Sequence, residues 1–401
     1  MIDYAGFLRD GLQGSDPRRI DRWLLFAVLG LCGGGLLMVY SSTSVLGQVR
    51  GQNDLLFLQN QLIRCVMGIA LLLLVARLDV RVFHHNARWL AWGLVVVLLI
   101  ILLIPSEMSV EVRGARRWLR LGGVLLQPSE FARYGLIVAL ASHLAQERGR
   151  LQSWRGLWIP AGAIALTAAL VAAQPHMSQA LLIAATGFGL LFLAGASIWR
   201  LLVLGFGGAA LAAGIALVSG NSYHLARIMT FLKGDGGALA FQPQQSMVAI
   251  GSGGLFGRGL GHGLQKYFFL PDPHTDFILS ILAEETGFFG LLVLFLVTGF
   301  ILWRIFVLGH RCTSGFGELL CFGVGLHFLM AFLLHTAVCM GWAPTTGIPF
   351  PLVSFGGSAL ISNLLGVGLV LSVSRRRVEA DPWIPAERFS WLRPESARRR
   401  V

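Results

Sequence analysis

Acidic side chains lie at the mouth of one long apolar run in this sequence, and a few lie inside it. The stretch FFLPDPHTDFILSILAEETGFFG carries Asp272, His274 and Asp276 before the run, and Glu284 and Glu285 within it. Carboxylates at membrane depth are costly, so they are expected to be paired or functional. A partly desolvated carboxylate can have a raised pKa and act as a general base, which makes Asp276 the candidate catalytic residue.

Asp276 also has a purely structural interpretation. An Asp at the start of a helix commonly accepts backbone N–H bonds as the N-cap residue. If the helix begins near Asp276, Glu284 lies about 80° around the axis from it and Glu285 lies on the far side. Glu284 could then share a cavity with Asp276, whereas Glu285 would pair with a neighbouring helix.

An arginine-rich segment, VRGARRWLRLGGVLLQPSEFAR, precedes another apolar run. Its arginines are spaced as on one face of a short helix, at Arg113, Arg116, Arg117 and Arg120. They either anchor lipid headgroups or bind an anion, since a guanidinium group grips phosphate bidentately. Further on, Pro128 and Ser129 fit a helix start, with Ser129 as a cap, and Glu130 suits the positive end of that helix.

A third polar segment, MGWAPTTGIPFPLVSFGGSA, enters the last apolar run. It contains Pro344, Pro349 and Pro351, followed by Gly356 and Gly357. Broken backbone at membrane depth is tolerated only inside protein or beside a wet cavity. The segment is therefore either a kinked re-entrant turn or part of the wall of a substrate groove.

The composition is that of an integral membrane protein. Of the 401 residues, 55% are hydrophobic and 13% are charged, whereas soluble domains carry about 25% charge. The net charge of +12 comes mostly from arginine, and membrane orientation with anionic lipids explains it, so no nucleic-acid partner is expected. None of the five cysteines forms a C-x-x-C pair, which argues against a disulfide framework or a zinc site.

The sequence contains ten apolar runs that approach the roughly 20 residues a helix needs to cross a bilayer. They lie at residues 21–43, 57–77, 86–105, 130–147, 157–174, 178–196, 199–219, 277–308, 317–340 and 352–374. We therefore expect an all-α polytopic membrane protein with ten transmembrane helices. Its transmembrane domain would cover residues 21–374, between a cytoplasmic N-terminal segment (1–20) and a cytoplasmic C-terminal tail (375–401). Residues 220–276 would form a long extracytoplasmic loop, with short helices, between helices 7 and 8.

The basic residues predict the orientation. With the N-terminus inside, most of the 32 Lys and Arg residues fall in cytoplasmic segments, as the positive-inside rule requires. An even number of spans returns the C-terminus to the cytoplasm. The three polar segments then lie outside, and the outside arginines between spans three and four are exceptions to the rule.

Together the three segments resemble the SEDS family (shape, elongation, division and sporulation), whose best known members are RodA and FtsW. The matching motifs are GARRWLRLGG…QPSEFAR at 114–133, GSGGLFGRGLG…LPDPHTDFI…EE…G at 251–287, and PTTGIPFPLVSFGGSA at 344–359. GLLMVYSS at 35–42 also fits the first helix of the family. The resemblance spans nearly the whole chain and implies a multi-pass protein of the bacterial cytoplasmic (inner) membrane.

The resemblance implies a peptidoglycan glycosyltransferase that polymerises lipid II during division or elongation. The essential acid of the family corresponds to Asp276, which would deprotonate the GlcNAc 4-hydroxyl of the acceptor. The donor is a glycan on undecaprenyl pyrophosphate, where a divalent cation, Mg²⁺ or Mn²⁺, would act if one is used. The residues expected to bind substrate are Arg116, Arg117, Trp118, Gln127, Ser129, Glu130, Arg133, Lys266, His274, Thr275, Glu284, Ser354 and Ser358.

The implied partners are a class B penicillin-binding protein, which is the transpeptidase typical of the family, other divisome or elongasome proteins, and membrane lipids. A rival interpretation is a lipid II flippase or a non-catalytic scaffold. A scaffold would not need Asp276, and a flippase would need polar groups along a complete path across the bilayer. The charges instead cluster at the outer end, which favours the enzyme.

Some positions separate the branches of the family, and others depart from its pattern. The RLxxFxxxxG-like spacing from Arg227 to Gly234, the Gln265-Lys266 pair and the polar N-terminal segment favour an FtsW-like protein, whereas PTTGIPFP favours RodA. We therefore expect an FtsW-like member of the family. His176 stands in a Q-P-D-type turn where the family has Asp, His335 replaces a frequent Asn, and Arg133 replaces a usual Lys. If the missing Asp matters, the chain would be a weaker or differently regulated polymerase.

Overall fold

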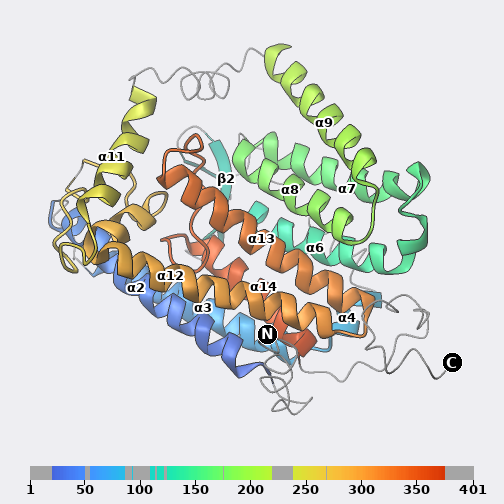
Figure 1. The fold of residues 1–401 in the computed structure, drawn as a ribbon, viewed down its shortest axis with the longest axis horizontal. Helices are drawn as coiled ribbons and strands as arrows, with labels where there is room; N and C mark the ends of the chain where they lie inside the picture. The colour runs from blue at the N-terminus through green and yellow to red at the C-terminus, as the bar shows by residue number, and fades with distance from the viewer. Residues whose placement is uncertain are drawn as a thin grey trace, which may run out of the picture.

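Helices make up most of this protein, and they run up and down a single bundle (Figure 1). The computed structural model describes residues 20–49, 55–85, 93, 109–112, 115–121, 124–174, 176–218, 238–267 and 269–374. The helices are α2 (Arg22–Val49), α3 (Leu56–Arg77), α4 (Val80–His85), α6 (Pro128–Glu147), α7 (Trp154–Ala172), α8 (Met177–Leu193), α9 (Ile198–Val218), α11 (Ala238–Ser252), α12 (Ile278–Arg311), α13 (Gly315–Cys339) and α14 (Gly357–Ser374). A 3-10 turn, η1 (Arg148–Arg150), follows α6, and the strands are β1 (Ser109–Val112), β2 (Ala115–Leu121) and β3 (Val124–Leu126).

The expected all-α membrane architecture is confirmed for the described residues. Nine of the ten predicted spans coincide with helices, and the run at 86–105 lies outside the described part apart from residue 93. Six of these helices are long and apolar enough to cross a membrane, and α8 and part of α9 are shorter apolar helices. The total of ten stays a prediction. The expected domain boundaries do too, since 1–19, 219–237 and 375–401 also lie outside the described residues.

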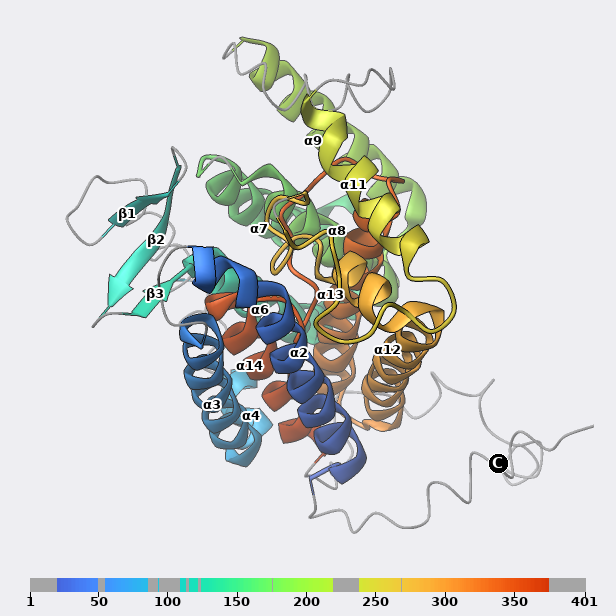
Figure 2. The same ribbon diagram turned by 90° about the vertical axis from the view of Figure 1, so that its left-hand side faces the viewer.

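Helix α14 lies at the centre of the bundle, next to α3, α6 and α13 (Figure 2). It is the most enclosed of the candidate spans, with 89% of its apolar window buried. Glycines allow this close packing, as is usual between helices in membranes. A Cβ at Gly366 would lie 2.2 Å from the ring of Tyr134, and one at Gly368 would lie 2.9 Å from the carbonyl oxygen of Leu72. The second half of α14 therefore packs closely against α3 and α6.

Helix α12 is interrupted two residues after the pair of glutamates. Gly287 has φ 66° and ψ −162°, a conformation in which only glycine is comfortable. A Cβ at this position would lie 2.3 Å from the backbone nitrogen of Gly257. The break therefore lets the loop after α11 pack directly against the helix backbone.

The arginine-rich segment is a strand, so the expectation of a short helix there is wrong. β1, β2 and β3 form a three-stranded antiparallel sheet in that order. Val110 pairs with Trp118 while Glu111 pairs with Arg116, so Arg117 is an extra residue opposite an irregularity in β1. A bulge of this kind re-aims a side chain. The apolar periodicity did not indicate this small sheet.

A hollow of about 840 Å³ lies between α2 and α12. Its lining is apolar except for Thr286, and includes Gly30, Gly34, Met38 and Phe289. None of the residues expected to bind substrate lines this hollow, so the candidate site lies elsewhere.

Candidate active site at the outer end of the bundle

Asp276 lies in a tight turn just before α12, and it is partly exposed. The N-cap residue of α12 is Phe277, which makes no side-chain capping bond, so the interpretation of Asp276 as the N-cap is wrong. The Asp276 N–H instead donates to Asp272 O (3.2 Å). Asp272 itself has φ 51°, an uncommon value for a residue with a side chain. Asp276 therefore lies in the turn that precedes α12, one residue before the N-cap position.

The segment before α14 holds this turn from one side. Phe355 N–H donates to His274 O (2.9 Å), and Ser354 Oγ donates to Thr275 O (2.8 Å). The His274 ring packs against Phe355, with 5.5 Å between ring centroids. A Cβ at Gly347, which has φ 70°, would lie 3.7 Å from Asp276 Oδ2, so the bare backbone of Gly347 faces the acid. The proline-rich segment thus forms a wall beside Asp276.

The start of α14 also holds the arginine-bearing side. Gln127 N–H donates to Ser358 Oγ (2.8 Å), and Ser358 Oγ donates to Leu125 O (3.2 Å). Arg117 Nε donates to Gln174 O (2.9 Å), which ties β2 to the turn between α7 and α8. Trp118 is partly buried beside it, and the side chain of Arg116 lies outside the described part. Both halves of the predicted site therefore adjoin residues 354–358.

His176 occupies the turn between α7 and α8, at the N-cap position of α8. Its Nδ1 lies 3.1 Å from Gln127 Nε2, so the ring accepts the amide proton when Nε2 carries the imidazole hydrogen. Burial, and then the positive charges of Arg117 and Arg133, lowers the pKa of His176 to about 3. The residue is therefore neutral at physiological pH and gives this rim no negative charge.

Helix α6 carries a buried ion pair in its first two turns. Pro128 is its first residue and Gln127 its N-cap, so the interpretation of Ser129 as the cap is wrong. Arg133 Nη1 lies 2.7 Å from Glu130 Oε2, with side chains 5% and 4% exposed. Arg133 Nη2 donates to Asn363 Oδ1 (2.7 Å) and to Ser362 Oγ (3.0 Å). The charge of Arg133 is already neutralised inside the protein.

Sequence reasoning missed the partners of this ion pair. They are Ser362 and Asn363 on α14, together with Tyr134, whose hydroxyl donates to Asn363 Oδ1 (2.8 Å). The signal was available, because an Asn in an otherwise apolar span is a candidate for a specific role. Its pairing with α6 follows from the fold and could not be inferred from spacing.

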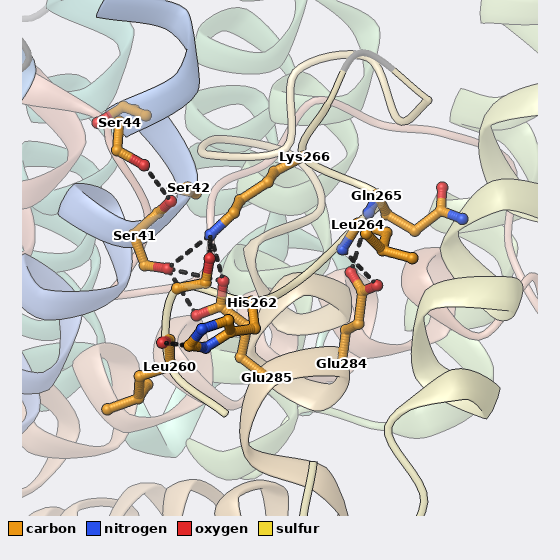
Figure 3. Close-up of polar contacts among 12 residues, drawn as sticks. Ser41, Ser42, Ser44, Leu260, His262, Leu264, Gln265, Lys266, Glu284 and Glu285 are labelled. Atoms are coloured by element: carbon orange, nitrogen blue, oxygen red, sulfur yellow. Dashed lines mark hydrogen bonds and ion pairs between the residues drawn. The ribbon is translucent and has the colours of Figure 1, made fainter. Parts of the chain in front are cut away.

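Lys266 and Glu285 lie against Ser41 of α2, whereas Glu284 points away from them toward the backbone of Leu264 and Gln265 (Figure 3). Lys266 Nζ is 2.8 Å from Glu285 Oε1, and Ser41 of α2 contacts the same carboxylate. The expected pairing of Glu285 with a neighbouring helix is thus confirmed. Glu284 accepts the backbone N–H groups of Leu264 (2.7 Å) and Gln265 (3.1 Å). Substrate binding by Lys266 and Glu284 stays a prediction.

The arrangement suits proton abstraction beside a bound anion. Asp276 is a partly exposed carboxylate beside bare backbone, and Arg117 is partly buried on a bulged strand. Among the described residues, no three His, Cys, Asp or Glu side chains cluster as a metal site would require.

Comparison with known proteins places the chain. Residues 22–379 match the family model described as "Cell cycle protein", which unites FtsW, RodA and SpoVE. A relative from Thioalkalivibrio sulfidiphilus, named "Probable peptidoglycan glycosyltransferase FtsW", is 37% identical over 92% of this chain and 93% of its own length. A relative of the same name from Coxiella burnetii is 33% identical over 88% of this chain and 96% of its own.

Solved structures agree with these sequence relatives. A chain from a peptidoglycan synthase complex, described as coordinating polymerization and crosslinking, is similar with a TM-score of 0.73 and 28% identity. That match covers 89% of this chain and 98% of the other. The rod shape determining protein RodA of Thermus thermophilus has a TM-score of 0.66 at 29% identity, over 90% and 98% of the two chains. The motifs, the helical bundle and the full-length matches agree, and the chain belongs to the FtsW/RodA/SpoVE family of cell cycle proteins.

Proposed function

We propose that this chain is a peptidoglycan glycosyltransferase that polymerises lipid II, with Asp276 as the general base. One observation carries the proposal. Asp276 is partly exposed in a non-helical turn beside Gly347, whereas Glu284 and Glu285 are each only 1% exposed. Of these three acids, Asp276 is therefore the one that a substrate can reach.

The chemistry follows from this placement. Asp276 takes the proton of the GlcNAc 4-hydroxyl, and the oxygen attacks the anomeric carbon of the donor sugar. The bond from that carbon to the undecaprenyl pyrophosphate oxygen breaks, and negative charge grows on the leaving group. Arg117, with Arg116 on the same strand, would stabilise that charge, which is the role of pre-placed donors in such reactions.

The other side chains near the turn have supporting roles. His274 and Thr275 supply the carbonyl oxygens that Phe355 and Ser354 hold, and Gln127 and Ser358 join the two halves of the site. Trp118 would pack against a sugar ring beside Arg117. Glu130 and Arg133 would support the rim from below through their ion pair, with Ser129 next to them.

The proposal includes orientation, location and partners. Exposed tryptophans begin α2, α7 and α9 at one end of the bundle, at Trp23, Trp158 and Trp199, as in the aromatic belt at a membrane surface. With the positive-inside rule, that end faces the cytoplasm of a bacterial inner membrane, and both termini lie there. The curated relatives support an FtsW-like role in division. The similarity to a synthase complex supports a transpeptidase partner of the class B penicillin-binding type.

The decisive experiment replaces Asp276 with asparagine. Polymerisation of purified lipid II, with the candidate transpeptidase present, is expected to fall at least 100-fold, since a general base contributes about 10²–10⁴-fold. The unfolding midpoint of Asp276→Asn in detergent should match that of the wild type. Glycan strands formed at the wild-type rate by this variant would exclude Asp276 from the mechanism and favour a scaffold or flippase.

A further inference from the structure

A buried cluster of charged and polar side chains joins α2, α12 and the loop between α11 and α12 (Figure 3). We call Ser41, Lys266, Glu284 and Glu285 the clasp. Lys266 and Glu285 form its ion pair, with 2.8 Å between Nζ and Oε1 and side chains 1% and 0% exposed. Ser41 Oγ lies 2.7 and 2.6 Å from the two carboxylate oxygens of Glu285. Three segments far apart in the sequence therefore meet at one sealed ion pair.

The ammonium group of Lys266 is fully satisfied within the clasp. It donates to Glu285 Oε1, to Gly261 O at 2.7 Å and to Ser41 Oγ at 3.2 Å. Lysine has three N–H donors, and each has a partner here. A side chain in this state has no N–H donor left for a substrate. In this respect Lys266 differs from Arg117, which is partly exposed.

Glu284 fixes the same loop through its backbone. Its carboxylate accepts the N–H groups of Leu264 and Gln265, immediately before Lys266. Backbone bonds continue the contact, since Arg258 N–H donates to Glu284 O and Gly259 N–H donates to Glu285 O, both at 3.0 Å. The loop therefore cannot shift along α12 without breaking these contacts and the ion pair together.

Stability alone does not account for such a cluster. Replacing a buried ion pair with apolar side chains of similar volume is often neutral or stabilising. The clasp has a geometric effect as well, because it closes the segment of chain that contains Asp276. Lys266 and Glu285 are 19 residues apart in the sequence, and Asp276 lies near the middle of the segment that their ion pair closes. The clasp thus fixes the base of the turn that presents Asp276.

We propose that Lys266, Glu285 and Ser41 are positioning residues that set the place of the Asp276 carboxylate. This inference rests on the proposed polymerase function of the same site. The turn has two attachments, the clasp on the α2 side and the Ser354 and Phe355 bonds on the α14 side. With the ion pair removed, the turn is held less firmly on the α2 side, while the Ser354 and Phe355 bonds remain. A displacement of about 1 Å at a catalytic group costs about 100-fold in rate.

The test is the double variant Lys266→Met/Glu285→Leu, assayed as the full chain with its transpeptidase partner on purified lipid II. Its unfolding midpoint should be unchanged or raised. We expect kcat to fall by about 10- to 100-fold, while KM for lipid II stays within about twofold, since the turn is displaced but the binding side chains remain. The matched control is Arg148→Met/Glu318→Leu, which removes another interhelical ion pair, 2.6 Å long, at the opposite end of the bundle. The control should keep the wild-type kcat.

Two kinetic outcomes would overturn the inference. A wild-type kcat in the folded double variant would mean that the clasp does not position Asp276. A raised KM with unchanged kcat would instead make Lys266 a substrate contact, as the sequence predicted. If the double variant does not fold, Ser41→Ala carries the same test, because it keeps the ion pair and removes one partner of each charge. It should lower kcat severalfold at unchanged KM, and a wild-type kcat would again refute the inference.

A second readout does not depend on polymerase activity. Cys339 is fully buried, and its Sγ lies 3.8 Å from Asp276 O. Movement of the turn should expose this thiol, so maleimide labelling of Cys339, mapped by mass spectrometry, should be faster in the clasp variant than in the control. If the wild type makes no glycan, the proposed function fails, and the labelling still decides the positioning role. Equal labelling rates in the two variants would overturn it.

Discussion

Replacing Arg133 with methionine is expected to destabilise the protein by about 3–5 kcal/mol, the usual cost of breaking a buried ion pair from one side. Arg133 and Glu130 are 2.7 Å apart and almost completely buried. Methionine keeps much of the volume but leaves Glu130 charged, with Ser362 Oγ at 3.5 Å among its contacts. At about 1.4 kcal/mol for each factor of ten, the folding equilibrium constant would fall at least 100-fold.

A double-mutant cycle checks this reasoning. Glu130→Gln, Arg133→Met and the combined variant are unfolded in detergent and followed by the fluorescence of the 11 tryptophans. Glu130→Gln should relieve most of the cost of Arg133→Met, because it removes the charge left unpaired, and the coupling energy should exceed about 2 kcal/mol. Two results would refute the description of this pair as buried and mutually dependent. One is a decrease in the free energy of unfolding of less than about 1 kcal/mol for Arg133→Met, and the other is strict additivity of the two single-variant decreases.

Two further predictions concern His176 and Arg117, on the arginine-bearing side of the site. The pKa of His176, lowered to about 3, lies below its unfolded value of about 6.5, so the unfolded chain binds the extra proton and stability is lost as pH falls from 6.5 towards 3. Asparagine does not titrate, so the unfolding midpoint of His176→Asn should fall less than that of the wild type between pH 7.5 and 5. Midpoints that fall in parallel would contradict this. Arg117→Ala should raise KM for lipid II about tenfold, since a hydrogen bond to a charged group is worth about 1.5–3 kcal/mol. Arg150→Ala, at an exposed position on η1, should leave KM unchanged, and equal effects would mean that Arg117 only anchors lipid headgroups.

The spans were predictable because burial in a membrane leaves a long apolar signal. α2, α3, α12 and α13 coincide closely with apolar runs in the sequence. The strand β2 was not predictable in the same way, since the arginine spacing 113, 116, 117, 120 also fits a helix face. Backbone pairing with β1 and β3 decides between the two, and that pairing depends on residues outside β2 itself.

The candidate site was predictable in its residue types but not in its contacts. Asp276 and the segments at 114–133 and 344–359 were identified from their polar character and their resemblance to a family. The caps were assigned wrongly, because propensity cannot tell Ser129 from Gln127, or Asp276 from Phe277, when tertiary bonds fix where a helix begins. The contact of Glu284 with loop amides, and that of Arg133 with Asn363, join positions too distant for spacing to reveal.

Ser354 and Ser358 are four residues apart, yet one bonds the turn that carries the acid and the other bonds the strand and helix that follow the arginines. The separation between the proton acceptor and the anion-binding rim is thus set by the short stretch of chain from Ser354 to Ser358, at the entry to α14. A residue inserted here would shift one serine relative to the other and pull one side of the site away from the other. Loops elsewhere in these proteins can lengthen freely during evolution, but this interval should keep a constant length in every active relative.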